Sequence, residues 1–168
     1  MNPEIKLRAL EPEDLEWLYQ VENDSKMWDI GPTNVPYSRF LLHEYIATSK
    51  ADIYTDGQVR LIIENGVGDT IGLVDITNFD SKNRHAEVGI IICSNYRRKH
   101  YALITLNYLA KYALNVLHLH QLYAVIDSDN QASCKLFQKA GFQFQSDLKD
   151  WLYDGKKYHS AVLMQLFL

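Results

Sequence analysis

The chain has 168 residues, of which 47% are hydrophobic and 23% charged, so it has enough apolar material for a packed interior and too much for a disordered chain. That length predicts one domain over residues 1–168. A formal charge of -4 argues against a nucleic-acid partner, because contacts with phosphates favour a basic surface.

The first half of the chain predicts strands and helices in alternation. Residues 5–9 alternate apolar and polar side chains, which is typical of a half-buried strand, and Pro12 opens a helix with apolar residues at helical spacing. A second helix is expected over 40–48, ending before the polar segment 55–58. Three β-rich runs joined by short polar turns then predict an antiparallel meander over 59–64, 70–78 and 85–93.

The second half predicts a crossover between parallel strands. Apolar residues recur between 101 and 117 with the helical period of about 3.6 residues. Residues 122–126 form an apolar run that is typical of a short buried strand. If this strand pairs in parallel with the strand that ends at Cys93, the helix between them forms a right-handed crossover.

One more helix and a hairpin are predicted at the end. Asp129 or Asn130 can cap a helix that runs to Lys139, and Gly141 suits its C-terminal stop. Two strands then follow over 142–152 and 157–167. Together the elements predict an α/β (α+β) fold in which helices pack on one mixed sheet.

Neither a targeting segment nor disulfide chemistry is indicated. The N-terminal residues carry a charge every few positions, so they lack the apolar core of a signal peptide and the length of a membrane span. Cys93 and Cys134 have no CxxC spacing, which predicts two reduced thiols. We therefore expect a cytoplasmic protein with no membrane partner. The β-rich C-terminal run LMQLFL, residues 163–168, suits an exposed edge strand and hence a homo-oligomer.

A basic turn stands between a predicted buried strand and the longest predicted helix. Amides at a helix start lack intrahelical acceptors, and the helix dipole adds partial positive charge, so such a turn can hold a phosphate. Arg97, Arg98 and Lys99 add full charges. A basic run can also be a solvated surface, but this position favours an anion site.

Two segments carry a family resemblance. Residues 96–102, YRRKHYA, resemble the R/Q-x-x-G-x-G/A pyrophosphate turn of the GNAT acetyltransferases, and residues 130–142, NQASCKLFQKAGF, resemble their N-x-x-S-x-x-L-Y/F-x-K-x-G-F segment. The resemblance runs over nearly the whole chain and is nearest the spermidine acetyltransferase and ribosomal-protein acetyltransferase branches. It implies one N-acetyltransferase domain with a mixed seven-stranded sheet and about four helices. It also implies acetyl-CoA as cosubstrate.

The resemblance assigns contacts with acetyl-CoA. The basic turn gives its amides to the pyrophosphate, and Asn130 and Ser133 lie beside the pantetheine arm. A backbone amide in a strand bulge near Ile91 or Ile92 faces the reacting carbonyl. The full set of expected cofactor contacts is Ile91, Cys93, Arg97, Arg98, Lys99, His100, Tyr101, Ala102, Asn130, Ser133, Phe137 and Lys139.

Two residues depart from the family pattern. His100 stands where the family has its central glycine, and a Cβ there obstructs close backbone approach. Phe137 stands where many relatives carry a tyrosine that protonates the CoA thiolate, so a slower reaction or a substitute donor is expected. These departures leave open an alternative, a non-catalytic protein that binds CoA or acyl-CoA.

Acyl transfer to an amine requires a neutral nitrogen. An alkyl amine with a pKa of about 10.4 is neutral in only about one molecule in a few thousand at pH 7, so a proton acceptor is useful. Glu87 is the predicted catalytic residue, because the resemblance places it near the acceptor amine. A surface carboxylate without a catalytic part is the alternative for this position.

The acceptor is not identified by the sequence. A polyamine, a peptide or protein N-terminus and another small amine all remain open, because the charges around the first helices show no clear acidic excess. The residues expected to line the acceptor site are Trp28, Asp29, Glu44 and Trp151. No metal site is expected, since the histidines are scattered and lack carboxylate or cysteine company.

Overall fold

The computed structural model describes residues 3–24, 35–50 and 52–168. Seven strands form one mixed sheet, the number expected from the sequence. Their order in the sheet is β1-β2-β3-β4-β5-β7-β6. The strands are β1 (Ile5–Ala9), β2 (Val59–Asn65), β3 (Thr70–Asp80), β4 (His85–Ile92), β5 (Gln121–Asp127), β6 (Gln143–Tyr153) and β7 (Tyr158–Phe167).

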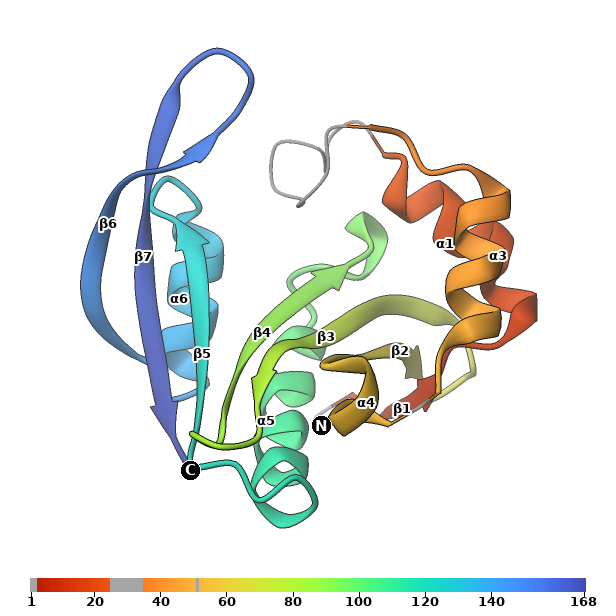
Figure 1. Cartoon of the computed structure of the whole chain (residues 1–168), viewed down its shortest axis with the longest axis horizontal. Helices are drawn as coiled ribbons and strands as arrows, with labels where there is room; N and C mark the ends of the chain where they lie inside the picture. The colour runs from red at the N-terminus through yellow and green to blue at the C-terminus, as the bar shows by residue number, and fades with distance from the viewer. Residues whose placement is uncertain (1–2, 25–34, 51) are drawn as a thin grey trace.

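Helices cover both faces of the sheet. On one face α1 and α3 lie side by side (Figure 1) and bury Leu18 and Leu42 against Leu73 of β3. On the other face α5 and α6 pack on the larger core, to which α5 contributes Leu106 and Leu109. The helices of the described residues are α1 (Leu15–Glu22), α3 (Arg39–Thr48), α4 (Ile53–Asp56), α5 (Tyr101–Asn115) and α6 (Gln131–Lys139).

Within the described residues of the N-terminal half, the predicted strands and helices are confirmed, and one short helix was missed. The meander β2-β3-β4 is antiparallel throughout. The missed element is α4, which occupies part of the segment predicted to be polar loop. Asp52 caps this single helical turn by accepting a hydrogen bond from Tyr54 N–H at 3.1 Å, and Gly57 ends it with a φ of 67°.

The predicted crossover is also confirmed. β4 and β5 are parallel and are connected through α5. They pair at only three positions, from His85 opposite Gln121 to Glu87 opposite Tyr123. Beyond this point the two strands diverge, as Figure 1 shows. The sheet is therefore split along one seam.

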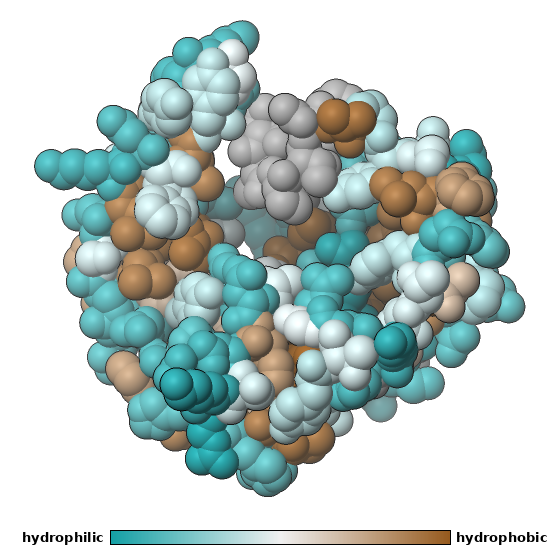
Figure 2. Space-filling view, viewed as in Figure 1, coloured by the Kyte–Doolittle hydropathy of each residue, from teal (hydrophilic) through white to brown (hydrophobic). Residues whose placement is uncertain are grey.

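The sheet ends at β6, and β7, the last strand of the chain, lies inside the sheet. β7, which holds residues 158–167, pairs with β5 on one side and β6 on the other. The expectation that the C-terminal run forms an exposed edge was therefore wrong, because the chain turns back into the sheet after β6. Hydrophobic side chains reach the surface on this side of the molecule (Figure 2), among them Phe144 on β6, which is 57% exposed.

No helix in the described ranges is long and apolar enough to cross a membrane.

Candidate active site

The seam between β4 and β5 leaves one edge of β4 without a strand partner. Residues 88–92 keep their pairing with β3. On the β5 side, the pairing among the described residues stops at Glu87. Unpaired backbone N–H and C=O groups on a strand edge can bind an extended ligand by main-chain hydrogen bonds. The β4 edge therefore suits a ligand that carries amides of its own.

The basic turn directly follows this edge. A short 3-10 turn (Ser94–Tyr96) ends β4, and α5 begins at Tyr101. Arg98 and His100 have φ angles of 59° and 67°. Both lie in the left-handed region that glycine enters without steric cost. His100 thus adopts a glycine-like backbone conformation despite its Cβ.

The start of α5 offers unpaired donors to an anion. No side chain in the described part of the chain caps this helix, and at its start Ile104 N–H donates a hydrogen bond to the carbonyl of His100. Amides earlier in the first turn have no intrahelical acceptor. The side chains of Arg98 and Lys99 are exposed beside them. This combination of amides, dipole and charge suits a diphosphate.

Arg97 has a structural contact as well as a charge. Its Nε donates a hydrogen bond to the carbonyl of Ile92 at 2.9 Å, which fixes the turn to the end of β4. Cys93, between them, is half-buried, and burial raises the pKa of its thiol. Burial thus disfavours the thiolate, which is the nucleophilic form of cysteine.

The strand bulge expected near Ile91 or Ile92 is absent from the β3–β4 pairing. The register runs without interruption from Gly72 opposite Ile92 to Thr77 opposite Glu87. The β3–β4 register therefore does not confirm this expectation. The two backbones approach closely here: a Cβ at Gly72 would stand 2.1 Å from the carbonyl oxygen of Ile91. The irregularity lies at the other end, between Thr77 and Asp80.

Glu87 lies at the point where β4 and β5 part. Its side chain is on the same sheet face as Ile91, which packs toward α1 and α3, because strand side chains alternate. Glu87 is half-buried, and its Oε2 accepts a hydrogen bond from Asn78 Nδ2 at 2.7 Å. Tyr123 lies opposite Glu87 on β5. Burial first, and then the negative charge of Glu87, raise the pKa of the Tyr123 hydroxyl.

On the other side of the seam, the segment after β5 has the predicted cap. Asn130 Oδ1 accepts a hydrogen bond from Ser133 N–H at 3.1 Å, so Asn130 and not Asp129 caps α6. Phe137 is 4% exposed and packs edge-on against Phe142, with ring centroids 5.0 Å apart. Lys139 is exposed at the end of the helix.

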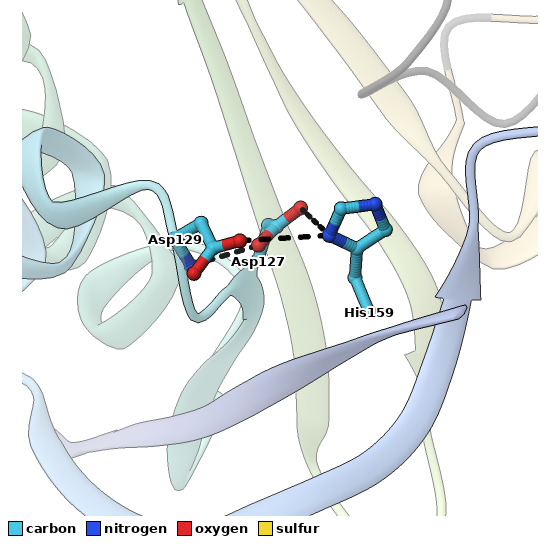
Figure 3. Close-up of side chains that lie close together, drawn as sticks. All are labelled: Asp127, Asp129 and His159. Atoms are coloured by element: carbon cyan, nitrogen blue, oxygen red, sulfur yellow. Dashed lines mark hydrogen bonds and ion pairs between the residues drawn. The ribbon is translucent and has the colours of Figure 1, made fainter. Parts of the chain in front are cut away.

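A group of charged side chains near the end of β5 was not foreseen from the sequence. Figure 3 shows the ring of His159 facing Asp127 and Asp129. Its Nδ1 lies 3.6 Å from Asp129 Oδ2 and 4.0 Å from Asp127 Oδ2. Its Nε2 lies 2.7 Å from Asp154 Oδ2. That hydrogen bond, above all, raises the pKa of His159 and holds the pKa of Asp154 well below its usual range.

The ring of His159 connects two parts of the fold. It contacts Asp127 at the end of β5 and Asp154 in the hairpin between β6 and β7. Potential ligand atoms of Asp127, Asp129 and His159 lie within 4.8 Å of one another, a grouping with the chemistry of a metal ligand set. No local pattern indicated this grouping, because His159 is about thirty residues from Asp127 and Asp129 along the chain.

Comparisons with known proteins show the family to which this chain belongs. Residues 4–143 match the acetyltransferase (GNAT) domain family. The chain belongs to the GNAT acetyltransferases. It is accordingly an acetyl-CoA-dependent N-acetyltransferase, as the two sequence segments predicted.

Two relatives that match over most of their length are named as N-acetyltransferases. The spermidine N(1)-acetyltransferase of Escherichia coli (strain K12) is 28% identical over 163 residues, which cover 97% of this chain and 86% of the relative. The putative ribosomal N-acetyltransferase YdaF of Bacillus subtilis (strain 168) is 27% identical over 173 residues, covering 99% and 92%. The sequence had indicated both branches.

A solved GNAT structure extends the likeness to three dimensions. The spermidine N-acetyltransferase of Vibrio cholerae, in complex with CoA and spermine, has a TM-score of 0.86 with this chain at 26% identity. The match covers 97% of this chain and 95% of the other. The predicted GNAT fold is confirmed.

The structure does not gather the predicted acceptor residues into one place. Trp28 and Asp29 lie outside the described residues. Glu44 is exposed on α3, where its Oε1 lies 3.7 Å from His43 Nδ1. Trp151 is 59% exposed on β6. α3 and β6 lie on opposite sides of the molecule (Figure 1), so these two side chains do not line a common wall.

Proposed function

We propose that this acetyltransferase acts on a primary amine of a polyamine, with Glu87 as the group that accepts the amine's proton. The observation that carries the proposal is the place of Glu87: a half-buried carboxylate at the last paired position before the seam, on the face toward α1 and α3. Two full-length relatives named spermidine N(1)-acetyltransferase support the choice of amine.

The negative charge on this face of the sheet also supports a polycation as the acceptor substrate. Asp127 lies four residues beyond Tyr123 on β5, so both side chains are on the same face, roughly 13 Å apart along the strand. Around Asp127, three carboxylates lie within 4.0 Å of the ring of a single histidine, His159. The excess negative charge attracts a ligand with several ammonium groups. A long polyamine can extend from Glu87 toward this group.

In the proposed arrangement the turn and the β4 edge hold acetyl-CoA. Arg98, Lys99 and the first amides of α5 bind the diphosphate, and residues 88–92 offer backbone bonds to the amides of the pantetheine arm. Asn130 and Ser133 border the arm from the β5 side, as proposed from the family pattern. Bound acetyl-CoA supplies the activated thioester that carries the acetyl group.

Glu87 addresses the protonation of the amine. At pH 7 an alkyl amine with a pKa of about 10.4 is almost wholly charged, and a charged nitrogen has no lone pair for attack. Glu87 accepts the proton directly or through one water molecule. Proton transfer by a positioned group typically contributes a factor of about 100 to 10,000 in rate.

Phe137 indicates how the thiolate leaves. Its ring packs against Phe142 in the core, so the position has no hydroxyl to donate a proton. A thiol has a pKa of about 8.5, so a thiolate is a fair leaving group without protonation. We propose that CoA departs as the thiolate or takes its proton from water, at a cost in rate.

A panel of amines tests the proposal. The protein is incubated with acetyl-CoA and spermidine, spermine, a peptide with a free N-terminus, or no amine, while thiol release is followed and products are identified by mass spectrometry. Thiol release with spermidine or spermine and the acetylated polyamine are expected. Acetylation of the peptide alone would contradict the proposed acceptor. Stabilisation by acetyl-CoA without turnover on any amine would indicate a binding protein instead.

We extend the proposal to the setting of the enzyme. Residues 1–168 act as one catalytic domain. The free thiols of Cys93 and Cys134 fit a reducing compartment, and we place the enzyme in the cytoplasm. Association of two copies would use the β6 edge, where Phe144 and Trp151 are exposed.

A further inference from the structure

A β-bulge interrupts β3 opposite the candidate catalytic strand. Thr77 pairs with Glu87 and Asp80 pairs with His85, so Asn78 and Phe79 together stand opposite the single residue Ala86. Bulges of this kind bend a strand and redirect a side chain, and they are enriched beside active sites. This bulge adjoins the residue proposed to accept the substrate's proton.

The bulge turns Asn78 toward Glu87. In a regular strand the side chains of Thr77 and Asn78 would point to opposite faces, and only Thr77 would share the face of its partner Glu87. Asn78 instead has a φ of 49°, and its Nδ2 reaches Glu87 Oε2 at 2.7 Å. Asparagine tolerates this left-handed conformation better than most residues. The extra residue also frees Phe79 to pack edge-on against Tyr54, with centroids 5.2 Å apart.

The hydrogen bond constrains Glu87 while leaving it able to react. Within the described part of the chain, Glu87 Oε1 has no protein donor, whereas Oε2 is held by Asn78. Tyr123 faces Glu87 across the seam, and the pKa of its hydroxyl is raised by burial and by the charge of Glu87. Asn78, Glu87 and the start of the seam are thus close together.

We propose that Asn78 is a positioning residue for acetyl transfer: the bulge presents its amide to Glu87 Oε2, which fixes the carboxylate so that Oε1 faces the acceptor amine. This inference rests on the proposed role of Glu87. A flexible glutamate has three rotatable bonds, and a single ordered rotamer raises the fraction of time in which Oε1 is aligned for proton transfer.

The test compares Asn78→Gly with Asn78→Asp, each alone and combined with Glu87→Gln. Glycine accepts the left-handed backbone of the bulge, so Asn78→Gly removes the amide without straining the strand. Asn78→Asp keeps size and backbone preference but replaces the donor with a carboxylate that repels Glu87. Melting temperatures of all variants check that the fold is retained. Spermidine is the acceptor, and kcat and the KM for acetyl-CoA are measured separately.

The expected result is a loss in kcat of roughly ten- to a hundredfold for Asn78→Gly and at least as much for Asn78→Asp, with the KM for acetyl-CoA unchanged. In the Glu87→Gln background neither substitution should lower kcat further, because the group they position is gone. An equal loss in both backgrounds, or wild-type kcat in Asn78→Asp, would overturn the inference. Wild-type kcat in Glu87→Gln alone would instead overturn the proposed role of Glu87 and the positioning role with it.

Discussion

The two arms of the sheet, on either side of the seam, are built differently. The β1–β4 arm is closely packed: Ile62, Ile63 and Leu73 are wholly buried, and backbone approaches backbone at Gly72. The outer strand of the β5–β7 arm, β6, is mostly exposed, and the turn of its hairpin contacts the end of β5 through the side chains around His159. The rigid arm carries Glu87 and the basic turn, and the looser arm carries the acidic side chains that we propose to attract the acceptor.

The two arms should tolerate substitutions to different degrees. Groups that must be aligned to a fraction of an ångström belong on the arm whose core leaves no freedom. Contacts with a flexible polycation need charge more than exact position, and a polar, exposed arm can supply it. Substitutions in the two arms should therefore differ in size and in kind.

The largest effect is expected for Gly72→Ala in the rigid arm. The new Cβ would stand 2.1 Å from the carbonyl oxygen of Ile91, which is backbone and cannot move aside. We expect a loss of more than about 3 kcal/mol in the free energy of unfolding, measured by chemical denaturation.

Gly89→Ala is the matched control for this change. It lies on the neighbouring strand, and a Cβ there meets no atom within 4 Å. Its free energy of unfolding should change by less than about 0.5 kcal/mol. Equal losses in the two variants would show that the close approach of β3 and β4 is not what makes this arm rigid.

A smaller effect of opposite sign is expected at the turn that joins the arm to α5. His100→Gly removes a Cβ from a residue with a φ of 67°. Relief of the left-handed strain should stabilise the protein by about 1 kcal/mol, offset in part by the greater freedom of glycine in the unfolded chain. Thermal unfolding measures the stability, and calorimetric titration with CoA measures whether the freed turn binds more tightly.

His100→Ala separates the two contributions. It removes the imidazole but keeps the Cβ and its strain. If the two variants proved equally stable, the backbone strain assigned to His100 would be excluded.

The smallest effect is expected in the looser arm, for Asp154→Asn. The hydrogen bond with Asp154 raises the pKa of His159 above its ordinary 6.5, so its stabilisation is present below that value and is lost as pH rises through the pKa of the folded protein. The pKa of Asp154 is lowered from its ordinary 3.8, so its part is lost as pH falls. The wild type should thus exceed Asp154→Asn in stability mainly between these pH values.

NMR titration of the His159 ring tests this directly. Its pKa should fall in Asp154→Asn relative to the wild type, while the ring of exposed His43 serves as the reference within the same sample. An unchanged pKa for His159 would show that Asp154 does not hold the imidazolium and that the hairpin is fixed by other contacts.

Local patterns in the sequence predicted most of the fold. The apolar period over 101–117 and the alternation over 5–9 each depend on neighbours in the chain, and α5 and β1 lie where these patterns indicated, although α5 ends at Asn115. The turn α4 was missed because its cap, Asp52, and its stop, Gly57, enclose only four residues. Four residues are too short for a period to be detected.

The site was predictable in part for the same reason. The turn at Arg97 and the cap at Asn130 are local motifs, and both were found. The amide of Asn78 beside Glu87 and the ring of His159 beside Asp127 depend on strand register and on a bulge. Neighbouring residues in the sequence do not indicate these two contacts, because a shift of one residue in the strand pairing would send each side chain to the opposite face of the sheet.

The most direct test of the central claim is acetyl transfer to spermidine by the wild type and by Glu87→Gln, followed by thiol release across a range of pH with acetyl-CoA saturating. We expect amine-dependent turnover by the wild type and a loss in kcat/KM of about a hundredfold or more in Glu87→Gln, greatest at low pH, where the amine most needs a proton acceptor. An unchanged pH profile in Glu87→Gln, or no spermidine-dependent thiol release by the wild type, would contradict it.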